Sequence, residues 1–328
     1  MVNKKQIDRI SVLAKQLETA RAKVFETKQE LDQEIQSALA MAADETEIKR
    51  AALISDTELT RIKGPALDES VGYKYRCSNT AITRDQLYDV PIDRYKTLRE
   101  VDWEKYTPGA TTRIIIQPAP DVLPIDLLYF PRKSPRLIVA FHGAEDRKVL
   151  DAPKFQFTRS LSRRSESLVF VSDSTLLNGP RINLGWVAGN KDIHVGTEIA
   201  NALNQIILAK GHKETILLGH SGGGFAAMLV GSKIPNSRAI SVNGQSVVKR
   251  YEPWTVLNLK NEAFPETSSI EEMAEKYANR LDLRVALTNR EATSSFTYFG
   301  NYTDPVTFGR LPHFPLLAEH FGFDEGGA

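Results

Sequence analysis

The stretch Leu217-Leu218-Gly219-His220-Ser221-Gly222-Gly223-Gly224-Phe225 contains the pattern Gly-x-Ser-x-Gly at positions 219, 221 and 223. The apolar run that ends at Leu218 predicts a strand, and the residues from Phe225 to Lys233 predict a helix. A serine at such a sharp strand-to-helix turn has strained backbone angles that push its hydroxyl out above the sheet. The pattern therefore predicts Ser221 as a nucleophile. The alternative is a glycine-rich turn that serves packing alone.

Strands and helices alternate on both sides of this turn. Continuous apolar runs predict further strands at Leu137–Phe141, Leu168–Val171, Ala239–Val242 and Phe296–Phe299, and Val195–Lys210 predicts an amphipathic helix closed by Gly211. Two shorter runs, Arg113–Pro118 and Ile125–Tyr129, are separated by prolines and predict an antiparallel hairpin at a sheet edge. This alternation predicts a mostly parallel sheet with right-handed crossovers.

A second loop, Phe141-His142-Gly143-Ala144, follows an earlier buried strand. Loops in this place supply a backbone N–H to an oxyanion hole, so Gly143 or Ala144 is the expected donor. The other donor is expected to be the amide of Gly222, at the start of the helix. His142 is expected to shape the loop rather than act as a base. A simple turn containing a histidine is the alternative.

A serine hydroxyl needs a base to remove its proton and an acid to orient that base. In proteins with this serine turn, the order along the chain is serine, acid, histidine. Only His313 and His320 follow Ser221 among the histidines. Asp304 comes just after the predicted last strand and is the expected acid, with a turn-capping aspartate before Pro305 as the alternative.

The choice of base rests on the two histidine environments. His313 lies in Leu-Pro-His-Phe-Pro, which predicts a loop held rigid by two prolines. His320 lies in Leu316–Phe321, which predicts a terminal helix. We therefore prefer His313 and keep His320 as the alternative base.

From about residue 110 to residue 322 the chain resembles the α/β-hydrolase superfamily of esterases and lipases. The resemblance implies an α/β-hydrolase fold, in which helices flank a mostly parallel central sheet. It also implies acyl-ester chemistry, with Ser221 as nucleophile, Asp304 as acid and His313 as base. The chain departs from the common pattern because few residues separate Asp304 from His313 and because a long helical segment precedes the domain.

Two short motifs carry a second resemblance. Gly185-Trp186-x-x-Gly189-Asn190 and Asn301-x-x-Asp304 are similar to hydrolase-type proteins found with bacterial surface-polysaccharide and glycoprotein export systems. An acetyltransferase-like component of the accessory secretion pathway is among them. This resemblance implies a glycan or glycoconjugate ester as one class of substrate, beside a small-molecule ester.

The chain falls into segments of different composition. Residues 1–58 are predicted to be helical, because Lys4–Leu53 contains no Gly and no Pro and is rich in residues that favour helices. Its narrow apolar stripe fits a coiled coil that makes a homo-oligomer through residues 4–53, or a helix packed on its own domain. Residues 59–110 form a connector. Residues 111–328 form the hydrolase domain, with a cap-like insertion at 247–293 expected over the pocket.

Composition excludes several classes of function. The formal net charge of +1 gives no global basic field for nucleic acid. Cys77 is the only cysteine, so neither an internal disulfide nor a thiolate metal cluster can form, and we expect no metal and no cofactor. No run approaches the roughly 18 apolar residues of a membrane span, and the charged N-terminus does not resemble a signal peptide. A cytoplasmic protein is expected.

Two functions remain open at this point. The first is an enzyme that forms an acyl-Ser221 intermediate and either hydrolyses an ester or transfers the acyl group. The second is a non-catalytic scaffold with the same fold that assembles through its N-terminal helix. A nucleotide site at Gly222–Gly224 is disfavoured, because no lysine directly follows the glycines.

Overall fold

The structure is a computed structural model. It describes residues 44–53, 81–144, 152–288, 293–301 and 313–322, together with residue 290 and single positions between 9 and 59. The predicted acid Asp304, the cysteine Cys77 and most of the segment before residue 44 lie outside the described residues.

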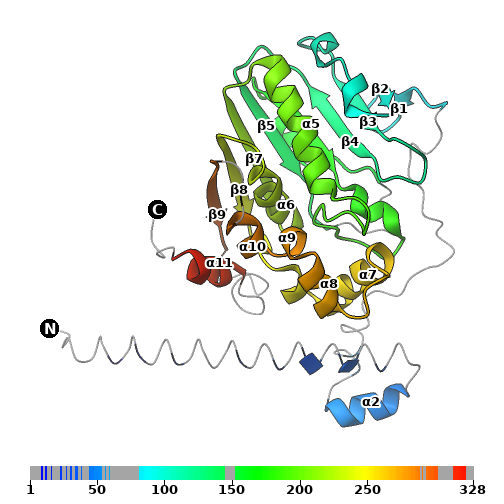
Figure 1. Cartoon of the computed structure of the whole chain (residues 1–328), viewed down its shortest axis with the longest axis vertical. Helices are drawn as coiled ribbons and strands as arrows, with labels where there is room; N and C mark the ends of the chain where they lie inside the picture. The colour runs from blue at the N-terminus through cyan, green and yellow to red at the C-terminus, as the bar shows by residue number, and fades with distance from the viewer. Residues whose placement is uncertain are drawn as a thin grey trace.

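Nine strands of the described chain form one sheet in the order β1-β2-β3-β4-β6-β5-β7-β8-β9 (Figure 1). Their bounds are β1 Arg84–Asp85, β2 Val90–Tyr95, β3 Thr112–Ile116, β4 Ile125–Phe130, β5 Arg136–Phe141, β6 Ser167–Ser172, β7 Glu214–His220, β8 Ser237–Val242 and β9 Ser295–Phe299. The block β6-β5-β7-β8-β9 is parallel throughout, whereas β4 is antiparallel to both β3 and β6. The predicted α/β class with a mostly parallel sheet is confirmed.

Helices lie along the sheet, and others gather below it in the view of Figure 1. The α-helices are α2 Glu45–Ala52, α4 Thr158–Leu161, α5 Val195–Lys210, α6 Gly222–Gly231, α7 Pro253–Ala263, α8 Ile270–Lys276, α9 Ala278–Leu281, α10 Leu283–Thr288 and α11 His313–Phe321. The described residues also form the short 3-10 helices η1 Leu98–Glu100, η2 Trp103–Lys105, η3 Ser174–Asn178 and η4 Val248–Arg250. None of the helices that the structure describes is both long enough and apolar enough to span a bilayer.

The core follows from the alternation of side chains along the two central strands. On β5, Leu137 and Val139 point into the larger apolar cluster, and Ile138 points into a second cluster on the other face. Both faces of β5 are therefore buried, as parallel strands require. Helix α5 covers the larger cluster with Ile199 and Leu203, four residues apart on one helical face. Burying each such side chain contributes about 1.5–3 kcal/mol.

Several predicted elements match the structure. The helix Val195–Lys210 is confirmed at both ends, and Gly211 caps it in the left-handed conformation at φ 65°. The predicted hairpin forms as the antiparallel pair β3 and β4. It does not lie at a sheet edge, because β2 pairs with β3 in parallel and β1 pairs with β2. Residues 84–95 of the predicted connector therefore belong to the sheet, which begins before residue 111.

The insertion leaves the sheet and returns to the same point. Val247 forms an isolated β-bridge with Asp282, and the N–H of Leu283 donates to the carbonyl of Ser246 at 2.8 Å. Helices α7, α8 and α9 lie between these two ends. Because the ends close beside Ser246, the insertion is anchored in the loop that follows β8.

The N-terminal segment differs from the prediction of one helix through Leu53. Asp44 is extended and caps a separate helix, α2, by accepting hydrogen bonds from the N–H groups of Thr46 and Glu47. An N-terminal aspartate cap starts a new helix, which is the physical reason for the interruption. Ile48 of α2 packs against Ile35 in a small cluster that is distinct from the cores of the sheet.

Self-association through this segment stays a prediction, and two described positions bear on it. Val12 is 55% exposed and Leu31 is 39% exposed, so apolar side chains there face solvent in one chain. We expect light scattering to give an oligomer for the full chain, and a lower mass for the Leu31→Glu variant and for a chain that starts at Leu59. Equal monomeric masses for all three would show that the helix packs on its own domain.

Candidate active site

Ser221 occupies the turn between β7 and α6. Its backbone angles are φ 56° and ψ −126°, a conformation that residues other than glycine rarely adopt. Its N–H donates to the carbonyl of Val242, at the end of the neighbouring strand β8, at 2.9 Å. The carbonyl of Ser221 accepts from the N–H of Gly224 at 2.9 Å, in the first turn of α6. The turn is therefore held from both sides, with the serine half-buried at the end of the sheet.

The glycines of the pattern are required by close backbone contacts. A Cβ on Gly219 would meet the carbonyl oxygen of Gly223. A Cβ on Gly223 would lie 2.5 Å from the carbonyl oxygen of Phe141 on β5. Both positions flank Ser221 at a spacing of two, so the sharp turn forms only when neither carries a side chain.

The loop after β5 lies directly beside the serine. A Cβ on Gly143 would lie 3.5 Å from the Cβ of Ser221. The N–H of Gly143, however, donates to the side-chain oxygen of Gln156 at 2.9 Å. This predicted oxyanion donor is thus brought to the serine, but its hydrogen is already engaged. Ala144 follows as an exposed residue, and Gly222 is the first residue of α6, so its N–H has no acceptor inside the helix.

His142 is buried and bonded on both ring nitrogens. Nε2 accepts from the N–H of Asp173 at 2.9 Å, so Nδ1 carries the proton and donates to the carbonyl of Gly143 at 2.8 Å. A ring with both nitrogens engaged by the backbone positions the loop. It is not available to take a proton from Ser221.

The described hydrogen-bond partner of the Ser221 hydroxyl is Gln245. The side-chain nitrogen of Gln245 lies 3.1 Å from Ser221 Oγ, and its side-chain oxygen accepts from Trp186 Nε1 at 3.1 Å. Gln245 and Trp186 are each 1% exposed. Sequence reasoning missed Gln245, and it singled out Trp186 only as part of a motif, with no role beside Ser221. The signal for Gln245 was its place just after the strand Ala239–Val242, at the same sheet edge as Ser221.

His313 contacts the loop after β8 that carries Gln245. The N–H of Ser246, the residue after Gln245, donates to His313 Nδ1 at 3.1 Å. His313 is 1% exposed, and its Nε2 has no hydrogen-bond partner among the described residues. The predicted rigid loop is corrected, because His313 is the first residue of α11 and Pro315 lies in that helix's first turn, where proline is tolerated.

The two candidate bases differ sharply in environment. Burial, with a smaller contribution from the positive charge of Arg250, lowers the pKa of His313 to about 3. His320 lies on α11 as predicted and is exposed, with Nε2 at 3.2 Å from the hydroxyl of Thr288. His313 is therefore the histidine that the structure brings to the loop beside Ser221. Asp304 lies outside the described residues.

No metal site emerges beside these groups. Within the part of the chain that the structure describes, no three His, Cys, Asp or Glu side chains gather in a way that could hold a metal ion.

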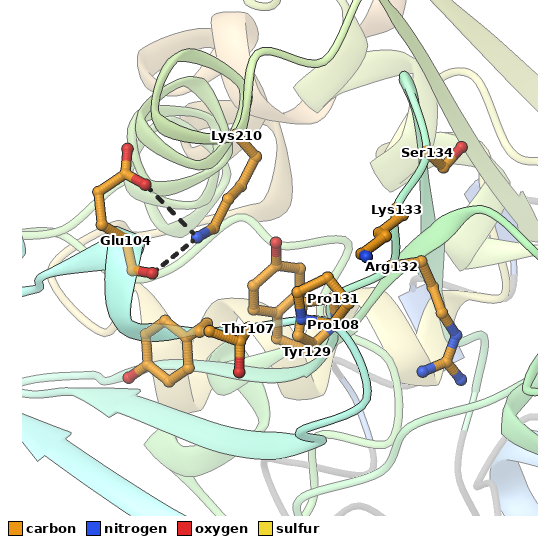
Figure 2. A pocket seen from close by; sticks show the side chains of 10 residues that line it. Glu104, Thr107, Pro108, Tyr129, Pro131, Arg132, Lys133, Ser134 and Lys210 are labelled. Atoms are coloured by element: carbon orange, nitrogen blue, oxygen red, sulfur yellow. Dashed lines mark hydrogen bonds and ion pairs between the residues drawn. The ribbon is translucent and has the colours of Figure 1, made fainter.

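A cavity of about 310 Å³ lies at the opposite edge of the sheet (Figure 2). Its wall includes Lys133, on the loop into β5, and Lys210, whose amino group donates to the carbonyl of Glu104 at 3.2 Å. β7 begins beside that loop, where the N–H of Lys213 donates to Pro135. Ser221 follows the far end of β7, about 20 Å away. The cavity is separate from the serine.

A second buried histidine gives a test of acid stability. Burial lowers the pKa of His194 to about 3, with a further contribution from the charges of Arg280 and Lys233. Between pH 6.5 and 3 the unfolded chain therefore binds a proton that the native ring does not, so stability falls as the pH falls. We expect His194→Asn to lessen the loss of unfolding free energy between pH 7 and pH 5 by about 2 kcal/mol.

Urea denaturation at the two pH values measures this loss for each protein. The hydroxyl of Thr197 lies 2.8 Å from His194 Nδ1. Asparagine gives this hydroxyl a similar polar partner, and its side chain does not titrate. The same pH dependence in the variant and in the wild type would contradict the prediction.

Comparison with known proteins finds solved structures of low sequence identity. No protein-family model matches the chain, and no curated protein matches it. A solved capsule O-acetyltransferase of Neisseria meningitidis serogroup A is 16% identical at a TM-score of 0.43, covering 61% of this chain and 81% of that chain. The Gap123 complex from Streptococcus agalactiae is 14% identical at a TM-score of 0.38, and the match covers 63% of this chain and 46% of that chain. The Mycobacterium tuberculosis protein MPT51 is 13% identical at a TM-score of 0.39, and the match covers 62% of this chain and 82% of that chain.

The fold is that of the α/β-hydrolases. The parallel block that carries Ser221, the antiparallel strand β4 and the serine turn before α6 agree with the sequence prediction on this point.

Proposed function

We propose that the protein is an enzyme of the serine-hydrolase type that acts on a carboxylic ester through an acyl intermediate on Ser221. The single observation that carries the proposal is the strained turn of Ser221, at φ 56° and ψ −126° between β7 and α6. Strain of this kind costs on the order of 1–3 kcal/mol and persists where the surroundings hold it, commonly at active sites. Here the hydroxyl it presents also meets a buried amide.

In the proposed reaction, Ser221 Oγ bonds to the carbonyl carbon while its proton passes to a base. The carbonyl electron pair moves to oxygen and forms an oxyanion, which collapses as the bond to the leaving alcohol breaks and the alcohol takes the proton. Water or an acceptor hydroxyl then attacks the acyl-serine. Hydrolysis and acyl transfer differ only in this second step, and the ester is of small-molecule or glycan type.

His313 is proposed as the base and Asp304 as the acid that orients it. Support for His313 comes from its position against Ser246, next to the residue that holds the Ser221 hydroxyl, and from its unpartnered Nε2. In the structure Nδ1 accepts from the N–H of Ser246, which places the ring proton on Nε2. To accept the serine proton at Nε2, the ring must change tautomer, so that Nδ1 carries the proton and donates to an acceptor in place of Ser246. Asp304 is the acceptor that chain order and resemblance assign.

The test is covalent labelling by a fluorophosphonate probe, which reacts with activated serines. We expect labelling of the native protein, and mass spectrometry of the digest should locate the adduct on the peptide that carries Ser221. A native protein that stays unlabelled while a known serine esterase reacts in the same assay would reject the proposal. The scaffold function, which the exposed Val12 and Leu31 favour, would then be preferred.

A further inference from the structure

We infer that Gln245 is the side-chain donor of the oxyanion hole, and that Trp186 sets its orientation. The inference rests on the proposed function and adds a catalytic residue that neither the sequence pattern nor the resemblance assigns. It starts from a gap in the predicted donor set. The N–H of Gly143 is bonded to Gln156 at 2.9 Å, which leaves the exposed Ala144 and Gly222, whose N–H has no acceptor in its helix, as the backbone donors.

Chemistry determines which way the Gln245 amide faces. An indole N–H can only donate, so the atom that meets Trp186 Nε1 at 3.1 Å has to be the amide oxygen of Gln245. The amide nitrogen must then face Ser221, where it lies 3.1 Å from Oγ. A side-chain amide has two N–H groups, and the second makes no hydrogen bond with a described residue. Gln245 therefore presents donors to the serine in one orientation.

The orientation is held by a strained turn. Trp186 has φ 52° and Val187 has φ 51°, and positive φ is unusual for any non-glycine residue and most of all for a β-branched one. Buried Asp173 stabilises the turn by accepting the N–H of Val187 at 2.9 Å, and the N–H of Gly196 donates to the carbonyl of Val187 at 2.8 Å. The strain is thus compensated at a position whose indole directs Gln245.

This turn is connected to the loop of the predicted oxyanion donor. The N–H of Asp173 donates to His142 Nε2, and the other nitrogen of that ring donates to the carbonyl of Gly143. The ring of Trp186 packs edge-on against Tyr251 at 5.6 Å between centroids. The indole therefore has packing on one side and a bonded backbone on the other, which limits movement of the amide it holds.

The geometry suits the charge that develops on the substrate. Donors act when they lie about 2.7–3.1 Å from the oxyanion, whose oxygen sits next to Oγ in the tetrahedral intermediate. An amide nitrogen at 3.1 Å from Oγ reaches that position with a small shift. In the free protein the same N–H donates to Oγ, leaving the hydroxyl proton free to go to the base.

The test compares Gln245→Glu and Gln245→Met with the wild type on a short-chain aryl ester. Glutamate keeps an oxygen acceptor for Trp186 and removes the N–H donor, whereas methionine keeps the size and removes both groups. We expect kcat to fall about 10²–10³-fold in each, with little change in KM, because the donor acts on the transition state. Affinity for a trifluoromethyl ketone that mimics the tetrahedral state should fall in parallel, and the pH profile should keep its shape.

The matched control is Gln205→Met. Gln205 accepts from the indole of Trp103 at 2.9 Å, the same kind of pair on α5 and η2, away from Ser221. This variant should keep wild-type kcat. Trp186→Phe, which keeps an aromatic ring but frees the Gln245 amide, should lose part of kcat.

Failure of this inference and failure of the proposed function give different results. If the native protein labels at Ser221 and folded Gln245→Glu retains its kcat, Gln245 is not the donor, and only the inference is overturned. A loss of kcat without the parallel loss of ketone affinity would also overturn it, because a merely structural role predicts that pattern. A native protein that does not label at Ser221 rejects the proposed function itself.

Discussion

Ser221→Ala abolishes turnover of a short-chain aryl ester, with an expected loss on the order of 10⁶-fold in kcat. The size of the loss reflects the loss of the covalent route, since no other hydroxyl is presented on a strained turn at this sheet edge within the described residues. Labelling by the fluorophosphonate probe should disappear with it. Steady-state kinetics and intact-mass measurement follow the two losses in the same preparation.

The matched control for this experiment is Ser241→Ala. Ser241 is fully buried on β8, and its hydroxyl has no hydrogen-bond partner among the described residues. The hydroxyl of Ser241 lies next to Gly224, in the first turn of α6, because a Cβ on Gly224 would meet it. Ser241→Ala therefore removes a serine hydroxyl close to the same turn and leaves the proposed catalytic residues unchanged. Full activity in Ser221→Ala would remove the central proposal, whereas full activity in Ser241→Ala is expected.

Most strands of the sheet could be predicted from the sequence, because apolar runs and turn residues are local signals. α5 was predicted at both ends because its periodicity agrees with a C-terminal glycine, Gly211. The helix that the apolar pattern predicted from Phe225 begins three residues earlier, at Gly222, although three consecutive glycines disfavour a helix in isolation. Packing overrides that preference: a Cβ on Gly224 would lie 2.4 Å from Ser241 Oγ, so the small residues allow α6 to approach β8.

The site was predictable only in part, for physical reasons that differ among residues. Ser221 lies in a pattern whose spacing reports a backbone constraint, so sequence alone indicated it. Trp186 reaches Gln245 from a backbone conformation with φ 52°, and nothing in the sequence Gly-Trp-Val-Ala-Gly predicts a positive φ at the tryptophan. Gln245 acts through a side-chain contact across 24 residues, which needs the pairing of β7 with β8 before it can be seen.

Loss of the base is the second large effect. We expect His313→Ala and His313→Gln to reduce both probe labelling and kcat by several orders of magnitude, on the scale that removal of a triad member produces. Because His313 is 1% exposed, alanine also leaves a cavity, and a large-to-small change of this kind costs about 2–5 kcal/mol of stability. Glutamine fills more of the space, so thermal unfolding of both variants separates lost chemistry from lost folding.

His320→Ala is the matched control, since His320 is exposed on the same helix and contacts Thr288 of α10 and the ring of its neighbour Phe321. We expect it to retain near-wild-type labelling. Loss of labelling in His320→Ala, with labelling retained in His313→Ala, would assign the base to His320. Retention in both would show that no histidine of this chain that follows Ser221 activates it.

The pH profile of kcat/KM tests the role of His313 as the base independently of the variants. A base must be unprotonated to act, so activity falls as the pH drops through its pKa. Burial lowers the pKa of His313 to about 3, but an ionised Asp304 at Nδ1, which the proposal requires, raises it toward its ordinary value. An acid limb between about pH 6 and 7 is therefore expected, and a kcat/KM that stays level from about pH 5 to pH 8 would contradict the pairing of His313 with Asp304.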